Sequence, residues 1–404
     1  MMRRVVITGL GVVAPIGLDV PSFKDNLFAG KVAVRPVTFS RASGNQVVFA
    51  CCPAADYVPE QHFEAKRLNF YDRFAQFAVV AAREAWRDSG LAMTPELAPR
   101  AAVILGTGAG GQTTQEESHE KLAALGGRVH PFAIPRLMAN AGASQVSMDL
   151  GAQGPAFAIA SACASATHAI GTAFHMVRSG MAEIALTGGS EASLTYGTLK
   201  GWEALRVMAP DFCRPFSKDR QGMMLGEGGG VLVLETLESA HKRGAVIHAE
   251  LAGFGMSADA KDLTSPDEGG MARAVRGALE DAGASTDEVD YINAHGTGTR
   301  ANDVTETRAL YQVFGERAGK IPASSNKSMF GHALGAAGAL EMIAAVLSLR
   351  EQIAPPTMGF LAPDPECALD VVPNQARAMT IGLALKNSFA FGGLNAVLAV
   401  RRFV

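Results

Sequence analysis

The same order of strands, helices and glycine turns occurs twice along this chain, and this duplication constrains the fold more than any other feature. Each copy begins with a strand and a Gly-x-Gly, continues with a helix that closes on similar residues, and reaches a second strand followed by Gly-Thr-Gly. The matching segments are 5–11 with 249–255, 81–90 with 274–283, and 102–108 with 291–298. In both copies a strand then feeds a long helix rich in alanine and glycine. Self-similarity of this kind indicates two structural units of the same type.

Strands that alternate with helices predict an α/β fold in which each unit has a mainly parallel sheet covered by helices. We place the boundary at residue 245, so that residues 1–245 form the first half and residues 246–404 the second. Segments 18–70, 107–150 and 190–225 have no counterpart of similar length and are interpreted as insertions in the first half. Because ligand pockets form preferentially at domain interfaces, we expect the chemistry at the junction of the halves.

Cys163 lies between an apolar run and the predicted long helix of the first half, in Ser-Ala-Cys163-Ala-Ser-Ala-Thr-His168. A thiol at a helix N-terminus faces unpaired backbone N–H groups and the positive end of the helix dipole, and both favour the thiolate. Cys163 is therefore a candidate nucleophile. The alternative is a small buried hydrophobe, which is what most free cysteines are.

Two histidines of the second half lie in glycine-rich turns, His295 before Gly-Thr-Gly-Thr and His332 at the end of Asn-Lys327-Ser-Met-Phe-Gly-His332. Such turns hold a ring away from the packed layers, although either histidine alone is also compatible with a structural role. Glu341 follows on a helix face that is otherwise apolar. Burial of an unpaired carboxylate would be costly, so we expect a cation beside Glu341.

Two glycine-rich stretches invite further interpretation. Phe389-Ala-Phe391-Gly-Gly393 combines glycines with aromatic rings, so that backbone N–H groups can approach a substrate while a ring controls access; the alternative is a plain turn. The segment Gly106-Thr-Gly-Ala-Gly-Gly111 formally matches the dinucleotide-binding pattern. However, the residues about 20 positions further on are helical and polar and do not end a second strand on an acid, which argues against a nucleotide site.

Composition excludes several classes of function. With 404 residues and 48% hydrophobic content the chain can bury a large core. Its 36 basic and 39 acidic residues form no basic tract, which argues against nucleic acid. Glycine and proline interrupt the apolar start well before the roughly 20 residues of a membrane span, so neither a signal peptide nor a membrane segment is expected. The five cysteines show no metal-ligand spacing and no disulfide framework, which favours a reducing cytoplasm and no metal.

Four separated motifs, in this order, resemble those of the β-ketoacyl-acyl carrier protein synthases, in particular the elongating type II enzymes. The motifs are SACASA around Cys163, NAHGTGT around His295, NKSMFGH with Lys327 and His332, and NSFAFGGLN with Phe389 and Phe391. The resemblance extends from Arg4 to Val400. It implies the thiolase fold, in which two duplicated α/β halves with mainly parallel five-stranded sheets are arranged in layers of the order α-β-α-β-α.

The resemblance also implies an acyltransferase reaction in two steps. An acyl chain passes from a carrier thioester to Cys163, and a decarboxylative Claisen condensation with a malonyl carrier then gives a β-ketoacyl carrier two carbons longer. His295 and His332 resemble the pair that serves malonyl decarboxylation and condensation. Lys327 and Glu341 resemble the supporting ion pair. The N–H groups of Cys163 and Phe391 resemble the oxyanion hole, and Phe391 and Phe389 resemble the rings that gate it. Thr297 and Thr299 match threonines that contact the pantetheine arm. No cofactor is implied beyond the phosphopantetheine that carries the substrates.

The second histidine separates this chain from ketosynthases that prime from coenzyme A. Degradative thiolases need a second catalytic cysteine near the C-terminal glycine turn, and this chain has none near Gly392. Ala390, Leu394 and Phe330 depart from the commonest fatty-acid enzymes and are similar to residues of nodulation-type and type II polyketide ketosynthases. The pathway, whether fatty acid, polyketide or polyene, therefore stays open. Two other functions are compatible with part of the pattern: a chain-length partner subunit, and a cysteine hydrolase that uses Cys163 with one histidine.

The resemblance implies two kinds of partner. One is a second subunit, because the family is usually dimeric: either another copy of this chain, giving a homodimer, or a related ketosynthase-like subunit, giving a heterodimer. The other is an acyl carrier protein, which is acidic in this family, so a basic surface is expected around the mouth of the pocket. The candidates for that surface are Lys66, Arg67, Arg73 and Arg206.

Overall fold

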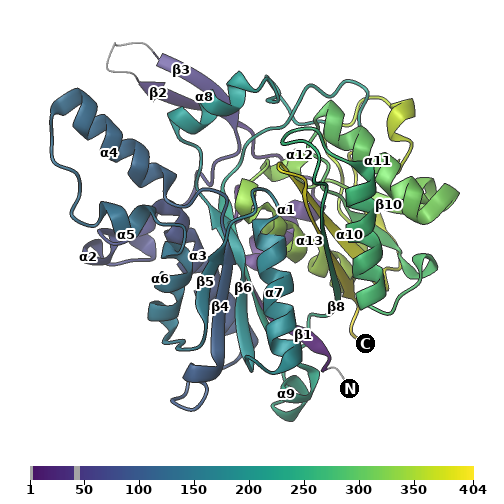
Figure 1. Ribbon diagram of the computed structural model, residues 1–404, viewed down its shortest axis with the longest axis horizontal. Helices are drawn as coiled ribbons and strands as arrows, with labels where there is room; N and C mark the ends of the chain where they lie inside the picture. The colour runs from purple at the N-terminus through teal and green to yellow at the C-terminus, as the bar shows by residue number, and fades with distance from the viewer. Residues whose placement is uncertain (1–2, 41–45) are drawn as a thin grey trace.

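The computed structural model describes residues 3–40 and 46–404 of the chain (Figure 1). The helices and strands of the first half are, in chain order, β1 (Val5–Val13), α1 (Val20–Phe28), β2 (Arg35–Ser40), β3 (Gln46–Cys51), α2 (Ala65–Leu68), α3 (Arg73–Ser89), β4 (Ala101–Gly106), α4 (Gln112–Leu125), α5 (Ala133–Leu137), α6 (Ala141–Leu150), β5 (Ala156–Ile159), α7 (Ser165–Ser179), β6 (Ile184–Glu191), α8 (Tyr196–Ala204), β7 (Gly228–Thr236) and α9 (Leu237–Lys242). Those of the second half are β8 (Ala249–Ala258), α10 (Glu268–Asp281), β9 (Tyr291–Asn293), α11 (Arg300–Phe314), β10 (Pro322–Ser324), α12 (Lys327–Phe330), α13 (Ala337–Glu351), β11 (Ile353–Ala354), β12 (Asp370–Val371), β13 (Arg377–Ala378), β14 (Leu383–Ala390) and β15 (Leu394–Arg401).

The predicted duplication is confirmed in the topology of the main sheet. Its strand order is β12-β10-β9-β14-β15-β8-β1-β7-β6-β4-β5. Outward from the centre, the first half therefore has the order β1-β7-β6-β4-β5 and the second the equivalent order β8-β15-β14-β9-β10. In each half four of these strands run in one direction, and only β7 or β15 runs against them. The mainly parallel five-stranded halves are thus as expected, with β12 added beside β10.

The two halves meet through equivalent strands. Val5 to Ile7 of β1 pair antiparallel with Leu251 to Ala249 of β8, which relates the halves by an approximate twofold axis between these strands. This short pairing joins the sheets of the two halves into one continuous sheet of eleven strands among the described residues. Residue 245 lies in the connection between α9 and β8, and the division of the chain into two domains at that point stays a prediction.

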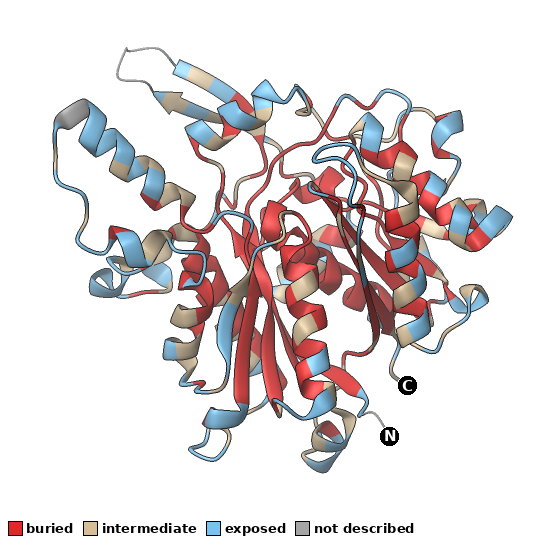
Figure 2. Cartoon of the chain, in the orientation of Figure 1, coloured by how far each residue is buried: buried red, intermediate tan, exposed pale blue. Residues whose placement is uncertain are grey.

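The helices form the expected layers around the two parts of the sheet. Helix α3 packs on β1 and β7, and α10 packs on β8 and β15, so these helices cover the outer faces. Helices α7 and α13 contact each other and strands of both halves, which places them in the middle layer (Figure 1). All of α13 from Ala337 to Leu349 is buried. Figure 2 shows the same central region in red.

The repeated Gly-x-Gly serves close packing of a helix on a strand. Both copies lie inside strands β1 and β8, and not in a turn after them as the sequence had indicated. A Cβ at Gly9 or Gly11 would come within 2.1 Å of a carbonyl oxygen of α3, and one at Gly253 or Gly255 within 2.4 Å of a carbonyl oxygen of α10. Any side chain there would push the outer helix away from the sheet.

The insertions of the first half lie outside the duplicated core. Segment 18–70 contains α1, the β2–β3 hairpin and α2; segment 107–150 contains α4, α5 and α6; and segment 190–225 contains α8. Figure 1 shows α4, α5 and α2 projecting to one side of the sheet and the hairpin with α8 above it. Among the described residues, no helix has the length and apolar content needed to cross a bilayer.

Candidate active site between the two halves

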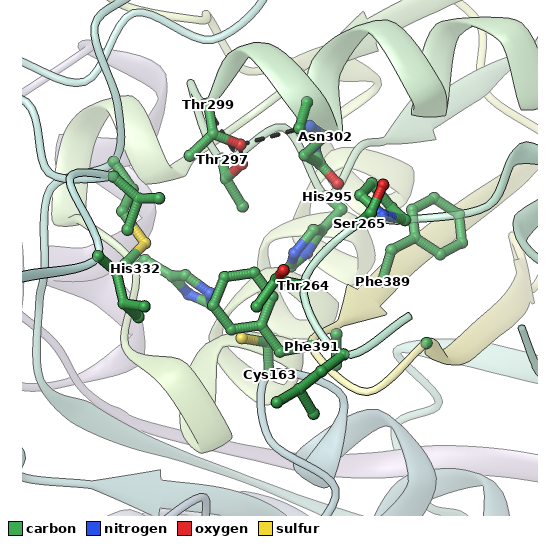
Figure 3. Close-up of a pocket in the computed structure, with 18 of the residues that line it drawn as sticks. Cys163, Thr264, Ser265, His295, Thr297, Thr299, Asn302, His332, Phe389 and Phe391 are labelled. Carbon is green, nitrogen blue, oxygen red and sulfur yellow. Dashed lines mark hydrogen bonds between the residues drawn. The ribbon is translucent and has the colours of Figure 1, made fainter. Parts of the chain in front are cut away.

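A cavity of about 290 Å³ lies at the junction of the halves and is lined by both of them (Figure 3). The first half contributes Cys163 and Trp202, and the second contributes His295, His332 and Phe391. The structure therefore brings the sulfur and the two imidazoles together around one space, although 132 and 169 positions separate the histidines from the cysteine along the chain. This is the arrangement that the duplicated sequence predicted at the junction.

A strained turn presents the thiol of Cys163 to the cavity. The preceding residue, Ala162, has a φ of 49°, which a residue with a side chain adopts rarely and at a cost of roughly 1–3 kcal/mol. Helix α7 begins at Ser165, so Cys163 lies just before its first turn. The side chain is nevertheless buried, with 7% of the residue exposed.

Burial decides the ionisation of this thiol. The pKa of Cys163 is raised to about 11, chiefly by desolvation, while the nearby Lys327 charge lowers it by less. The expectation that the helix N-terminus holds a thiolate is therefore wrong for the free chain. The loss of hydration of a buried anion outweighs the helix dipole, and the side chain of Cys163 is a neutral thiol.

His295 is fixed by groups on two sides. Its amide N–H donates to Glu306 Oε1 at 2.8 Å, and the amide of Gly296 donates to Oε2 at 2.8 Å. The Lys327 ammonium donates to the His295 carbonyl oxygen at 2.6 Å and lies 3.4 Å from Nδ1. Because an ammonium group has only donors, Nδ1 must accept and Nε2 must carry the proton. Burial first, and the Lys327 charge second, hold the pKa of His295 well below its usual value, so the ring is neutral.

His332 has both ring nitrogens available to a substrate. Neither Nδ1 nor Nε2 has a hydrogen-bond partner among the described residues, although both atoms are buried. The ring lies edge-on to His295, with 5.5 Å between the ring centroids. Burial, followed by the charges of Lys327 and Lys386, holds the pKa of His332 well below its usual value. A buried polar ring without a protein partner in a functional cavity is poised to bind a ligand atom.

The cation expected beside Glu341 is present, and a second one accompanies it. Lys327 forms an ion pair with Oε1 of Glu341, and Lys386 Nζ lies 3.1 Å from Oε2. All three side chains are at most 1% exposed. Lys386 lies outside the motifs that the sequence offered. The available signal was a lysine in the strand Leu383-Ala-Leu-Lys386, whose neighbours are apolar.

Three aromatic rings from the described residues line the cavity. The ring of Phe391 stacks on that of Trp202 with a centroid separation of 5.6 Å and an interplanar angle of 29°. Phe389 is buried against the edge of His295. Ala390, which the sequence marked as unusual, is the last residue of β14 and pairs with Leu394, so its backbone is extended and tolerates a methyl group. Trp202 was not predicted. It lies in an insertion, and nothing in its local sequence indicates a contact with Phe391, which is 189 positions further along the chain.

The two threonines of the His295 turn stand side by side. Their hydroxyl oxygens are 2.8 Å apart, and both residues line the cavity. Thr299 also caps α11 by accepting from the amide of Asn302. The hydroxyl groups of Thr297 and Thr299 therefore face the space that leads to the reactive groups (Figure 3).

The Gly-Thr-Gly turn of the first half holds a carboxylate. The amide of Gly108 donates to Glu191 Oε2 at 2.5 Å, and that of Gly335 donates to the same oxygen at 3.1 Å. Burial raises the pKa of Glu191 to about 7. The Glu191 side chain thus occupies N–H groups that a dinucleotide would need for its phosphates, in agreement with the argument against a nucleotide site.

The basic candidates for a docking surface are spread over the chain. Arg206 is exposed and follows Leu205, which lines the cavity. Lys66 and Arg67 lie on α2, which contributes no residue to this cavity, and Arg67 pairs with an acid of α6. Arg73 is half-buried, and its guanidinium donates twice to the carboxylate of Glu227, so its charge is already paired within the chain.

Comparisons with known proteins agree with one another. The model of the "Beta-ketoacyl synthase, N-terminal domain" matches residues 2–240, and that of the "Beta-ketoacyl synthase, C-terminal domain" matches residues 248–361. Nodulation protein E of Rhizobium sp. (strain N33) is 48% identical, and 3-oxoacyl-[acyl-carrier-protein] synthase 2 of Staphylococcus aureus (strain COL) is 42% identical, with 100% and 99% of each chain covered, respectively. Among solved structures, the ishigamide ketosynthase/chain length factor superposes with a TM-score of 0.94 at 38% identity over 100% of both chains.

Proposed function

The chain belongs to the β-ketoacyl synthase family, and we propose that its cavity lengthens a carrier-bound acyl chain by two carbons through decarboxylative condensation with a malonyl carrier. One observation carries this proposal: a buried thiol and two neutral imidazoles, from different halves, face the same closed space. A reaction that holds an acyl group on sulfur while a carbanion forms beside it needs this combination of groups.

In the first step the sulfur of Cys163 attacks the carbonyl carbon of an acyl carrier thioester. The thiol proton moves to the pantetheine sulfur as that bond breaks, and an unbonded nitrogen of His332 can relay it. We expect the backbone N–H groups of Cys163 and Phe391 to donate hydrogen bonds to the negative oxygen of the tetrahedral intermediate. Because the resting thiol is neutral, proton removal accompanies attack and does not precede it.

In the second step the malonyl thioester loses carbon dioxide, and the electron pair of the broken bond moves into an enolate. Its oxygen accepts hydrogen bonds from Nε2–H of His295 and from the ring N–H of His332, since a neutral imidazole carries one N–H donor. The enolate carbon attacks the acyl carbonyl, and collapse of that intermediate forms the β-ketoacyl carrier and releases the sulfur of Cys163, which takes up one proton from solvent to restore the neutral thiol. Lys327 supports the step by fixing the tautomer of His295.

A carrier protein is expected to dock where the cavity opens, with its pantetheine arm beside Thr297 and Thr299. We expect Arg206→Glu to raise the KM for carrier-bound substrates several-fold at low salt, because Arg206 adjoins Leu205 at the mouth and exposed charges steer association. Lys242→Glu, at an exposed lysine of α9 that is not a docking candidate, is the matched charge reversal. Steady-state kinetics at low and high salt measure both. An unchanged KM for the Arg206 variant would remove that residue from the docking surface.

An unpaired sheet edge supports assembly into dimers. Strand β5 is the last strand of the sheet, and its residues are exposed or half-buried (Figure 2). Apolar side chains stand beside it: Phe157 is 38% exposed, Met181 68% and Met256 65%. An open edge with an apolar flank is a template for pairing with another strand. The partner is either a second copy or a related subunit, as in the ketosynthase/chain length factor pair that the chain resembles.

One experiment tests the function and the assembly together. The purified chain is incubated with malonyl carrier and a panel of acyl carriers, and the carrier products are weighed by mass spectrometry. We expect β-ketoacyl carriers two carbons longer than the acyl donor. Free acid without a longer product would indicate a hydrolase. Native mass spectrometry of the same sample distinguishes a homodimer, at twice the 42.1 kDa of the chain, from a single chain that needs another subunit for activity.

We infer a cytoplasmic reaction that uses no cofactor besides the phosphopantetheine of the carrier. All five cysteines are unpaired, which fits a reducing compartment. The proton transfers and the electrophilic hydrogen bonds of both steps can be made by the residues described above.

A further inference from the structure

Lys386 is a fully buried cation on β14 that the motifs of the sequence did not include. Its side chain is 0% exposed. Burial of an ammonium group is costly unless it is paired and hydrogen-bonded, so a lysine in this position requires an explanation. The two lysines Lys327 and Lys386 share one carboxylate, that of Glu341. The ion pair of Lys327 with Glu341 is complete without Lys386.

The contacts of Lys386 come from both halves. Its Nζ donates to Thr167 Oγ1 at 3.0 Å and to the hydroxyl of Ser388, and it lies 3.1 Å from Glu341 Oε2. Thr167 lies in the first turn of α7, directly after Cys163, and its hydroxyl also bonds to that of Ser388 at 2.8 Å. One ammonium group therefore ties the nucleophile helix of the first half to α13 and β14 of the second.

The same ammonium group acts on the imidazoles through its charge. It lies close enough to lower the pKa of both His295 and His332. Removal of one positive charge at this position makes the surroundings of the cavity more negative by one unit. An enolate that forms in the cavity is then less well stabilised, because charges interact strongly in a dry interior.

We propose that Lys386 is a positioning residue of the condensation: it fixes the Cys163 helix against the carboxylate that orients Lys327, and its charge favours the enolate. This proposal rests on the proposed function. It predicts that Lys386 affects carbon–carbon bond formation more than the transfer of the acyl group to sulfur, because only the former develops the enolate.

The charged and titratable groups around Lys386 set the direction of its pH dependence. They are Glu341 on α13, Lys327 on α12, Glu306 on α11, His168 on α7, and the rings of His295 and His332. Desolvation lowers the pKa of Lys386 to about 8, against the opposing pull of Glu341. The charge is thus present below pH 8 and is lost as the pH rises through that value. Condensation by the native protein is expected to fall over the same range.

The test compares Lys386→Met with Lys386→Gln and the native protein. Methionine preserves length and apolar volume, and Glu341 keeps Lys327 as its partner, so the variant is expected to fold. Glutamine retains a donor without the charge. For Lys386→Met we expect about ten-fold slower condensation or more, a KM for malonyl carrier unchanged within about two-fold, and little change in acylation of Cys163. The decline near pH 8 should disappear, and the acid limb that reports His295 and His332 should move to higher pH. Lys242→Met, at an exposed lysine of α9, is the matched control.

The measurements are the rate of Cys163 acylation by mass, release of carbon dioxide from malonyl carrier, product formation between pH 5 and 10, and circular dichroism. Native-like condensation and an unchanged pH profile in a folded Lys386→Met would overturn the proposal. Loss of fold in both variants would also overturn it, because Lys386 would then serve stability alone. Partial recovery by Lys386→Gln with the pH decline still absent supports separate contributions of hydrogen bonding and charge. Absence of condensation in the native protein would instead contradict the proposed function.

Discussion

Cys163→Ala is expected to abolish condensation, by a factor of at least about 10³, because no other group in the cavity can hold the acyl chain as a thioester. The cavity contains this one thiol among its described lining residues. In the native protein, incubation with an acyl carrier should add the mass of the acyl group to the chain. In the variant this adduct should be absent, while the fold is retained because alanine removes only one buried sulfur.

The matched control for that variant is Cys367→Ala. Cys367 is also buried, in the core of the second half, but it does not line the cavity. This variant should acylate and condense at the native rate. An acyl adduct that persists on Cys163→Ala would show that another residue is the nucleophile, and the assignment of Cys163 would be wrong.

His332→Ala is expected to slow decarboxylation and condensation by about 10²–10³-fold, the usual cost of removing one donor to a developing oxyanion. Both ring nitrogens lack a protein partner among the described residues, so the substitution breaks no hydrogen bond and should leave the fold intact. Acylation of Cys163 should suffer less, because His332 contributes only a proton relay to that step. Carbon dioxide release and acyl adduct formation, measured separately, show this difference.

A second substitution separates donation from proton transfer at this position. His332→Asn keeps a neutral N–H donor but cannot accept and return a proton in the same way, so it should retain more decarboxylation than His332→Ala. His119→Ala, at an exposed histidine of α4, should behave as the native protein. Equal losses in both steps for the alanine variant would argue that His332 supports the structure of the site and not the enolate.

The pH dependence of the native enzyme follows from the same neutral rings. Because burial holds the pKa values of His295 and His332 well below the usual histidine value, the donors remain neutral as the pH falls through 6.5. Activity should therefore persist below pH 6.5 and decline only at a more acidic pH, where the two rings become protonated. A decline centred near pH 6.5 would indicate that the rings are hydrated in the working enzyme.

The sequence motifs correctly predicted that Cys163, His295 and His332 line one cavity. Cys163, His295 and His332 stand in local sequences whose turns and helix starts are determined by neighbouring residues, and duplication places such turns at equivalent edges of two similar sheets. The twofold relation of β1 and β8 then faces those edges toward each other. For this reason the sequence alone predicts that one cysteine sulfur and two imidazole rings, although distant along the chain, line the same cavity.

Other features depend on distances that no local pattern carries. Trp202 stacks on Phe391 only because an insertion of the first half folds over a turn of the second. No local pattern indicated Lys386 for the same reason. Its partners Thr167 and Glu341 belong to other elements, and they come close to Lys386 only in the folded chain.

The amino-acid sequence by itself determined that this protein is a duplicated α/β chain with a candidate nucleophilic cysteine at a helix start and two histidine turns, because strand and helix periodicity and glycine placement are local properties. The tertiary structure alone decided the ionisation of those groups. A helix start predicted a thiolate, but burial raises the pKa of Cys163 to about 11 and keeps the imidazoles neutral. Desolvation depends on everything that packs around an atom, and that surrounding is assembled from every part of the chain.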